Sequence, residues 1–171
     1  MLKINLNDYR SENILTESKL FKIVNRLKKQ GKKIGLCSGS FDLLHPGHVK
    51  HLESAKNLCD ILLVAVAEDK FSANKKSGSN RPIFSQELRA YMISKLKYVD
   101  YVTFEDGTPR VIEILKPDLF IRGIDSSNEI DSRMIASKRV VESYGGKVVY
   151  TQDEKLSSSE IIEYIRKNID C

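Results

Sequence analysis

The sequence predicts a single α/β domain built on a doubly wound, five-stranded parallel sheet, and three observations lead to this fold class. Short apolar runs of strand length alternate along the chain with segments whose apolar residues recur at helical spacing. The clearest run, ILLVAV at residues 61–66, is apolar throughout, which is typical of a strand covered on both faces. The 171 residues, 41% of them hydrophobic, suit one core. This alternation predicts a Rossmann-like arrangement.

The first expected element is a helix that ends near Gly31, with Thr16 or Ser18 available as its N-cap. Its apolar face is formed by four residues at i, i+3, i+4 and i+7 spacing: Leu20, Ile23, Val24 and Leu27. The preceding residues are polar and aperiodic. We therefore divide the chain into an N-terminal extension and helix, residues 1–30, and a main domain, residues 31–171.

The remaining elements follow in alternation. Five apolar or β-branched runs predict strands: residues 33–38, 61–66, 101–104, 118–121 and 147–150. Segments of helical period predict four helices: residues 49–57, 86–96, 110–115 and 132–144. A last helix is marked by isoleucines in phase: Ile161, Ile162, Ile165 and Ile169. The polar stretch 72–80 is the one expected mobile loop. Ligands of such sheets bind beyond the carboxyl ends of the strands, so the functional loops should follow strands.

Composition excludes several classes of protein. No apolar run approaches the roughly 20 residues that cross a bilayer, and the N-terminal sequence lacks the apolar stretch of a signal peptide, so we expect a cytoplasmic protein without a membrane partner. Cys37, Cys59 and Cys171 are widely spaced and are predicted to be free thiols. The formal net charge of +5 favours anionic ligands. Without a Trp or a basic run interleaved with aromatics, phosphorylated small molecules are favoured over nucleic acid.

The segment that indicates chemistry is SGSFDLLHPGH, which directly follows the first strand. All three histidines of the chain, His45, His48 and His51, lie in it or just beyond it. Pro46 suits a first helical turn, and Gly47 leaves no side chain over the helix start. An open helix N-terminus offers unpaired N–H groups and a partial positive charge, to which the two imidazoles beside Gly47 add polar groups. The pattern predicts a polyphosphate-binding cradle.

Other motifs with related chemistry are absent from the segment. It contains neither GxxxxGK[ST] nor GxGxxG, so it is not a P-loop or a dinucleotide fingerprint. The histidine spacing could suggest zinc, but Pro46 interrupts the helix phase and no fourth ligand is evident, so no protein-bound metal is expected. The position of His51 is equally consistent with an ordinary histidine on a helix surface and with a residue that contacts the substrate.

The segment resembles the signature of the HxGH nucleotidyltransferase superfamily, which includes cytidylyltransferases, adenylyltransferases and, more distantly, class I aminoacyl-tRNA synthetases. Further similarity is carried by RPIFSQELR at 81–89, VDYVTFEDGTPRVIEILKPDLFIRG at 99–123 and LSSSEII at 156–162. Together these motifs most resemble the bacterial heptose 1-phosphate adenylyltransferase domain, with glycerol 3-phosphate and related cytidylyltransferases as neighbours.

The resemblance implies roles for particular residues. His45, His48 and a loop lysine, for which Lys76 is the nearer match, would contact the nucleoside triphosphate during catalysis. Further residues would bind the nucleotide or its phosphates: Gly39, Ser40, Phe41, Asp42, Gly47, Arg122, Gly123, Ser157, Ser158 and Ser159. Arg122, at the carboxyl end of a strand, could bind the base, the ribose or an acceptor phosphate.

Several of these residues have simpler explanations. Asp42 can shape its turn by accepting backbone N–H groups, and Phe41 fits a core anchor better than a stacking platform. Arg122 could form a surface salt bridge. The three serines would cap the last helix whatever its function, so one could cap while another binds ligand. Four basic residues are either solvated surface charges or phosphate contacts: Lys75, Lys76, Arg81 and Arg89.

The residue types also suggest a mechanism. A phosphate acceptor with a second pKa near ~6 is largely a dianion at neutral pH and attacks the α-phosphorus without a protein base. The protein then supplies in-line positioning and positive charge, while Mg²⁺ bridges triphosphate oxygens and keeps several waters. We therefore expect ATP, or CTP, and a sugar 1-phosphate such as heptose 1-phosphate to give a nucleotide-diphospho product and pyrophosphate, in a homodimer as is usual for the resemblance. The alternatives are a cytidylyltransferase acting on glycerol 3-phosphate or another phosphomonoester, and a catalytically silent nucleotide-binding module.

Overall fold

Five strands form one parallel sheet in the order β3-β2-β1-β4-β5, in a computed structural model that describes residues 4–74, 81–124, 132–154 and 156–169. The strands are β1 (Ile34–Gly39), β2 (Ile61–Ala67), β3 (Tyr101–Glu105), β4 (Leu119–Gly123) and β5 (Lys147–Thr151). Every pairing is parallel. The predicted five-stranded α/β fold is confirmed, and each strand begins within one residue of its expected start.

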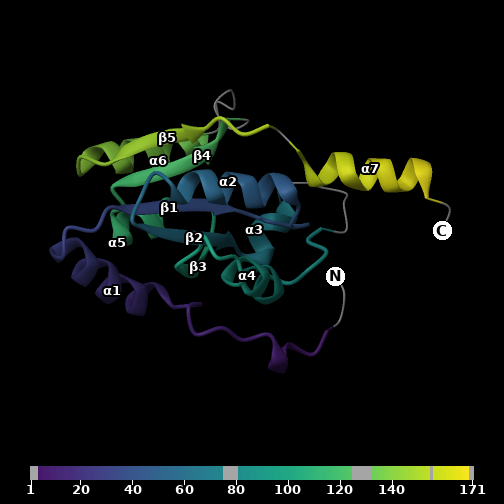
Figure 1. Ribbon diagram of the computed structural model, residues 1–171, viewed down its shortest axis with the longest axis horizontal. Coiled ribbons are helices and arrows are strands. Elements are labelled where there is room, and N and C mark those ends of the chain that lie inside the picture. The colour runs from purple at the N-terminus through teal and green to yellow at the C-terminus, as the bar shows by residue number, and fades with distance from the viewer. Residues whose placement is uncertain (1–3, 75–80, 125–131, 155, 170–171) are drawn as a thin grey trace.

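Helices cover both faces of the sheet (Figure 1). One face is packed by α2 (Pro46–Lys56) and α4 (Gln86–Ser94), and the other by α1 (Glu17–Lys29), α5 (Arg110–Leu115) and α6 (Ser132–Ser143). Two separate apolar clusters result, one on each side. This arrangement is the doubly wound form that the alternation of strands and helices predicts.

The central strand β2 explains why the sequence has an uninterrupted apolar run. Successive side chains of a strand point to opposite faces. Leu62, Val64 and Val66 accordingly pack against the α2 and α4 side, whereas Leu63 and Ala65 pack against the α1, α5 and α6 side. All five are fully buried, which explains why each of them is apolar.

Three features depart from the predicted boundaries. The second helix begins at Pro46 rather than residue 49, because proline is accommodated in a first helical turn. A short helix, α3 (Asp69–Asn74), occupies the start of the stretch expected to be a loop, and residues 75–80 lie outside the described part of the chain. In the polar N-terminal segment, Asn13 accepts a hydrogen bond from Val102 N of the edge strand β3, and Leu15 N donates to the Val102 carbonyl. A 3-10 helix spans Leu6–Asp8.

The last helix, α7 (Ser158–Asn168), projects away from the sheet (Figure 1). None of its residues is fully buried. Its apolar side chains are therefore partly or wholly exposed, and Tyr164 retains 66% of its accessible surface. Within the described residues, no helix has the length and apolar character needed to cross a membrane.

Candidate active site

A cavity of about 510 Å³ opens at the carboxyl edge of the sheet, where the order of the strands reverses. Strand β1 pairs with β2 on one side and with β4 on the other, so the loops that follow β1 and β4 diverge. Ser38 and Gly39 at the end of β1 line the cavity, as do Arg122 and Gly123 at the end of β4. The cavity therefore lies at the switch point, where ligands of such sheets bind.

The start of α2 brings the two predicted histidines to this cavity. His45 is the N-cap residue, and no side chain of the described residues caps the helix there. The rings of His45 and His48 stack with their centroids 3.7 Å apart, and the ring of Phe41 meets that of His48 edge-on at 5.2 Å. All three side chains line the cavity, so the histidines lie at the ligand-facing end of the helix.

Gly47 keeps the helix start open. A Cβ at this position would lie 3.1 Å from atoms of the His45 ring and 3.1 Å from the Cβ of Leu156, which is tighter than an ordinary van der Waals contact. Any larger residue would therefore displace the histidine or the segment before α7. The glycine serves close packing around the helix N-terminus.

Burial keeps both imidazoles neutral. The pKa of His48 is lowered to about 3, mainly by desolvation and further by repulsion from the neighbouring His45 and His51, against the opposing effect of a backbone hydrogen bond with Leu43. Desolvation also lowers the pKa of His45, against the opposing effect of the Glu160 carboxylate. A neutral imidazole offers one N–H donor and one acceptor nitrogen, so the free site presents polar groups without a fixed imidazolium charge.

Three residues that line this cavity each carry a buried side-chain nitrogen without a hydrogen-bond partner among the described residues. These nitrogens are Nδ1 of His45, Nδ1 of His48 and Nε of Arg122. Arg122 donates from Nη1 to the Ser38 hydroxyl at 3.4 Å, and its guanidinium lies 5.8 Å from the Phe120 ring centroid. No ion pair of Arg122 is seen within the described ranges, where the sequence had allowed a salt bridge. A buried polar group without a partner costs about 1–3 kcal/mol, so these nitrogens point to a ligand.

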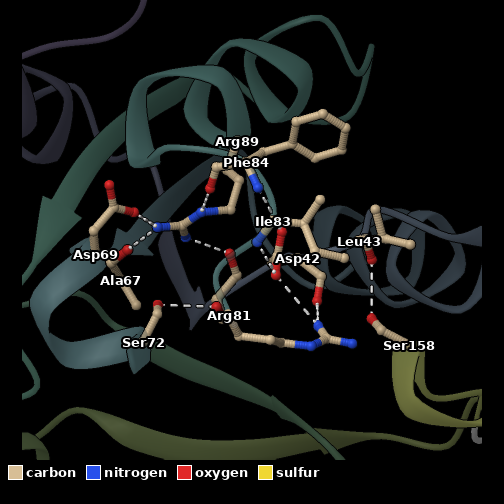
Figure 2. Close-up of polar contacts among 11 residues, drawn as sticks. Asp42, Leu43, Ala67, Asp69, Ser72, Arg81, Ile83, Phe84, Arg89 and Ser158 are labelled. Carbon is tan, nitrogen blue, oxygen red and sulfur yellow. Dashed lines mark hydrogen bonds and ion pairs between the residues drawn. The ribbon is translucent and has the colours of Figure 1, made fainter. Parts of the chain in front are cut away.

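The Asp42 carboxylate does not line the cavity. It is buried and accepts hydrogen bonds from Ile83 N at 2.9 Å, Phe84 N at 3.1 Å and Arg81 Nη1 at 3.3 Å (Figure 2). Asp42 thus shapes the loop, as the simpler explanation held, but through residues 81–84 rather than its sequence neighbours. Arg81 is likewise engaged with this loop, donating also to the Asp42 carbonyl oxygen.

The predicted serines do not line the cavity and lie in or near the loop that follows β1. Ser157 caps α7 in a capping box with Glu160, and Ser158 donates from Oγ to the Leu43 carbonyl at 3.0 Å (Figure 2). The Ser40 and Ser72 hydroxyls lie 3.0 Å apart. Ser159 follows on the first turn of α7. Lys75 and Lys76 fall outside the described residues, so the role of the loop lysine stays a prediction.

The expectation for Arg89 needs correction. The sequence allowed a solvated charge on a helix face or a phosphate contact, but the residue is completely buried and bonded to backbone carbonyl oxygens. The sequence pattern of the helix did not indicate that Arg89 is buried, because the carbonyl groups that it binds belong to three separate segments of the chain.

Sequence reasoning also missed groups at both ends of the cavity. Near β5, Nδ1 of His51 lies 2.8 Å from the Thr151 hydroxyl, and both residues line the cavity. At the opposite end, the lining includes Glu105, Phe71 and Arg133, whose guanidinium lies 4.9 Å from the Phe71 ring centroid. Glu105 and Thr151 end β3 and β5, so the rule that functional residues follow strands could have found them.

A doubly wound parallel sheet with a helix N-terminus and a neutral histidine pair at its switch point is typical of domains that bind phosphate groups. The cytidylyltransferase-like family matches residues 36–164. The chain belongs to this family. The resemblance seen in the HPGH segment is thereby confirmed.

Curated relatives are similar along most of the chain. The bifunctional protein HldE of Nitrosococcus oceani is 39% identical over 158 residues, which cover 91% of this chain and 32% of the relative. HldE of Geotalea uraniireducens is 40% identical over 147 residues, covering 84% of this chain and 29% of the relative. The chain therefore spans about a third of the length of these relatives.

Solved structures share the fold. The lipopolysaccharide core biosynthesis protein from Thermoplasma volcanium superposes with a TM-score of 0.61 at 29% identity, covering 73% of this chain and 100% of that one. Pantoate-beta-alanine ligase from Francisella tularensis superposes with a TM-score of 0.63 at 18% identity, covering 92% of this chain and 77% of that one. The second likeness concerns the fold alone.

Proposed function

We propose that the protein transfers the nucleotidyl group of ATP to a sugar 1-phosphate of the heptose 1-phosphate type, with release of pyrophosphate. The observation that carries the proposal is the set of three unpartnered nitrogens, from His45, His48 and Arg122, at one cavity beside an open helix N-terminus. The HldE relatives and the lipopolysaccharide core biosynthesis protein support a sugar phosphate as acceptor. Similarity of residues 81–89, 99–123 and 156–162 to heptose 1-phosphate adenylyltransferase domains favours ATP over CTP.

In this proposal the triphosphate lies along the start of α2. The helix dipole attracts the departing pyrophosphate, and the Gly47 N–H, for which no acceptor is seen among the described residues, can donate to it. Pro46 has no N–H, and the His48 and Val49 N–H groups donate to the His45 carbonyl. His45 and His48 donate hydrogen bonds to oxygens whose charge grows as the bond to the α-phosphorus breaks. Because both imidazoles are neutral before the ligand arrives, they bind without a competing protonation step in the neutral pH range.

The acceptor occupies the opposite end of the cavity. There the Arg133 guanidinium can pair with a phosphate, and the Glu105 carboxylate and Thr108 can bind sugar hydroxyls. Arg122, at the end of β4, lines the same cavity and contacts the nucleotidyl phosphate. An acceptor phosphate at this end attacks from the side away from the pyrophosphate, as an in-line displacement requires.

Mg²⁺ fits this site as a companion of the triphosphate rather than as an ion caged by the protein. The Asp42 oxygens are occupied by N–H groups of residues 81–84, so the loop offers no free carboxylate. Mg²⁺ commonly keeps several waters and is held largely by substrate phosphates. When bound, it neutralises charge on the triphosphate, while the protein positions the reacting groups.

We also infer a homodimer in which α7 forms the contact. The helix projects from the sheet, and its apolar residues are either half-buried, as Ile161 and Ile162 are, or exposed, as Tyr164 and Ile165 are. The exposed Ile169 is its C-cap residue. Burying such residues against a second copy is favourable at roughly 25 cal/mol per Å² of apolar surface removed from water.

The test is a pyrophosphate-release assay in which each of the four nucleoside triphosphates is combined with a panel of phosphomonoesters. The expected result is release with ATP and an aldose 1-phosphate and none when the acceptor is omitted. Release with CTP and glycerol 3-phosphate instead would replace the substrate assignment. No release with any pair, from protein that binds ATP, would contradict the transferase function.

A further inference from the structure

Arg89 of α4 is a fully buried charge that binds three separate segments of the chain. Its Nε donates to the Phe84 carbonyl at 3.0 Å, and its Nη1 donates to the Ser40 carbonyl at 2.5 Å. Its Nη2 donates to the Ala67 carbonyl at 2.8 Å and to the Asp69 carboxylate at 2.6 Å (Figure 2). Arg89 therefore joins the ends of β1 and β2 beneath the site, and Asp69 balances its charge.

The bond to Ser40 orients the loop that follows β1. The Ser40–Phe41 peptide is trans, so its C=O and N–H groups point in opposite directions. Because the carbonyl points to Arg89, the Phe41 N–H points away from Arg89. Among the described residues, no acceptor is found for this N–H.

The backbone conformation of Phe41 also indicates that its N–H is available to a ligand. Its φ of 54° is left-handed, an uncommon and unfavourable conformation for a bulky residue. Such conformations persist where the surroundings fix them, and here Arg89 holds the preceding peptide while the Asp42 carboxylate binds residues 81–84. A left-handed residue in a turn exposes backbone N–H groups in a concavity that binds anions.

We propose that Arg89 is a positioning residue: by holding the Ser40 carbonyl, it leaves the Phe41 amide free to donate a hydrogen bond to the nucleotide's phosphates. Phe41 and Gly39 line the same cavity as the histidines, so the amide and the open start of α2 act on one ligand. The proposal rests on the proposed nucleotidyl transfer, and it adds a backbone donor whose orientation depends on a side chain outside the cavity.

The test compares Arg89→Lys with Ile93→Ala. Lysine keeps the charge but has a single nitrogen, which cannot reach three carbonyl groups at once. Ile93 is a fully buried residue of the same helix, and its truncation destabilises the fold without touching Ser40. Affinity for ATP and for inorganic pyrophosphate is measured by calorimetry at a temperature where circular dichroism shows every variant folded. We expect Arg89→Lys to bind both about tenfold more weakly and to lose about 10 to 100-fold in kcat/KM, with Ile93→Ala within twofold of wild type.

A second variant covers the case in which Arg89→Lys does not fold. Arg89→Met combined with Asp69→Leu removes the whole buried ion pair and leaves no unpaired charge, a replacement that proteins often tolerate. It should show the same loss of pyrophosphate affinity. Wild-type affinity in either folded variant would overturn the proposal. Pyrophosphate binding is read without turnover, so a wild-type protein that binds pyrophosphate but transfers no nucleotide would refute the proposed function and leave the role of Arg89 to be decided by the variants.

Discussion

At the scale of single residues, the two stacked histidines of the site are neutral before the ligand binds. His45 and His48 stack on each other, and the Nδ1 atom of each lacks a partner among the described residues. The same burial that depresses their pKa values makes any hydrogen bond to phosphate stronger than it would be in water. The histidines are thus better suited to stabilising developing charge than to transferring protons at neutral pH.

Replacing His48 tests this role. In His48→Ala, kcat should fall about 10² to 10³-fold because one preorganised donor to the reacting phosphates is lost. Steady-state pyrophosphate release measures the loss, and Lys50→Ala on the exposed side of the same helix serves as the control. His48→Asn, which retains a side-chain donor, should recover part of the rate. Wild-type turnover in His48→Ala would remove the residue from the mechanism.

At the scale of elements, the opening of α2 decides whether the site can form. Gly47→Ala places a Cβ 3.1 Å from the His45 ring and from Leu156, so the helix start must shift by a few tenths of an ångström. We expect kcat/KM for the nucleotide to fall about tenfold, since small misplacements at such sites are costly. Alanine favours the helix by up to about 1 kcal/mol over glycine, so thermal stability should hold or rise. Equal losses in stability and activity would instead indicate general unfolding.

The elements also show what the sequence could and could not predict. The strands were recognisable mainly because the central strand β2 is buried on both faces, which favours an uninterrupted apolar run, as Leu62 to Val66 show. The histidines were recognisable because their segment follows the first strand. Arg89 was misjudged because its partners, Ser40 and Ala67, are distant in sequence and contribute backbone carbonyls, which leave no residue-type signal.

For the whole molecule, the buried histidines couple stability to pH. The pKa of His48 is about 3 in the folded chain against 6.5 ordinarily, so between these values the unfolded chain binds more protons. Stability from neutral His48 is therefore complete above pH 6.5 and is lost progressively as the pH falls toward 3. Thermal unfolding followed between pH 7 and pH 4.5 should show a steeper decline of Tm for wild type than for His48→Gln. Parallel curves would mean that His48 titrates normally.

The apolar residues of α7 bear on whether the molecule forms a dimer. The apolar residues of α7 alternate with polar ones at helical spacing, yet the helix has no fully buried residue and points away from the sheet. Ile165→Glu introduces a charge on the apolar face and should convert a dimer to a monomer across micromolar concentrations, because a buried charge without a partner is strongly unfavourable. Sedimentation equilibrium measures the change. Lys167→Ala, which removes only the exposed ion pair with Glu163, should leave the dimer intact. If wild type sediments as a monomer throughout this range, the exposed face of α7 is not a contact between copies.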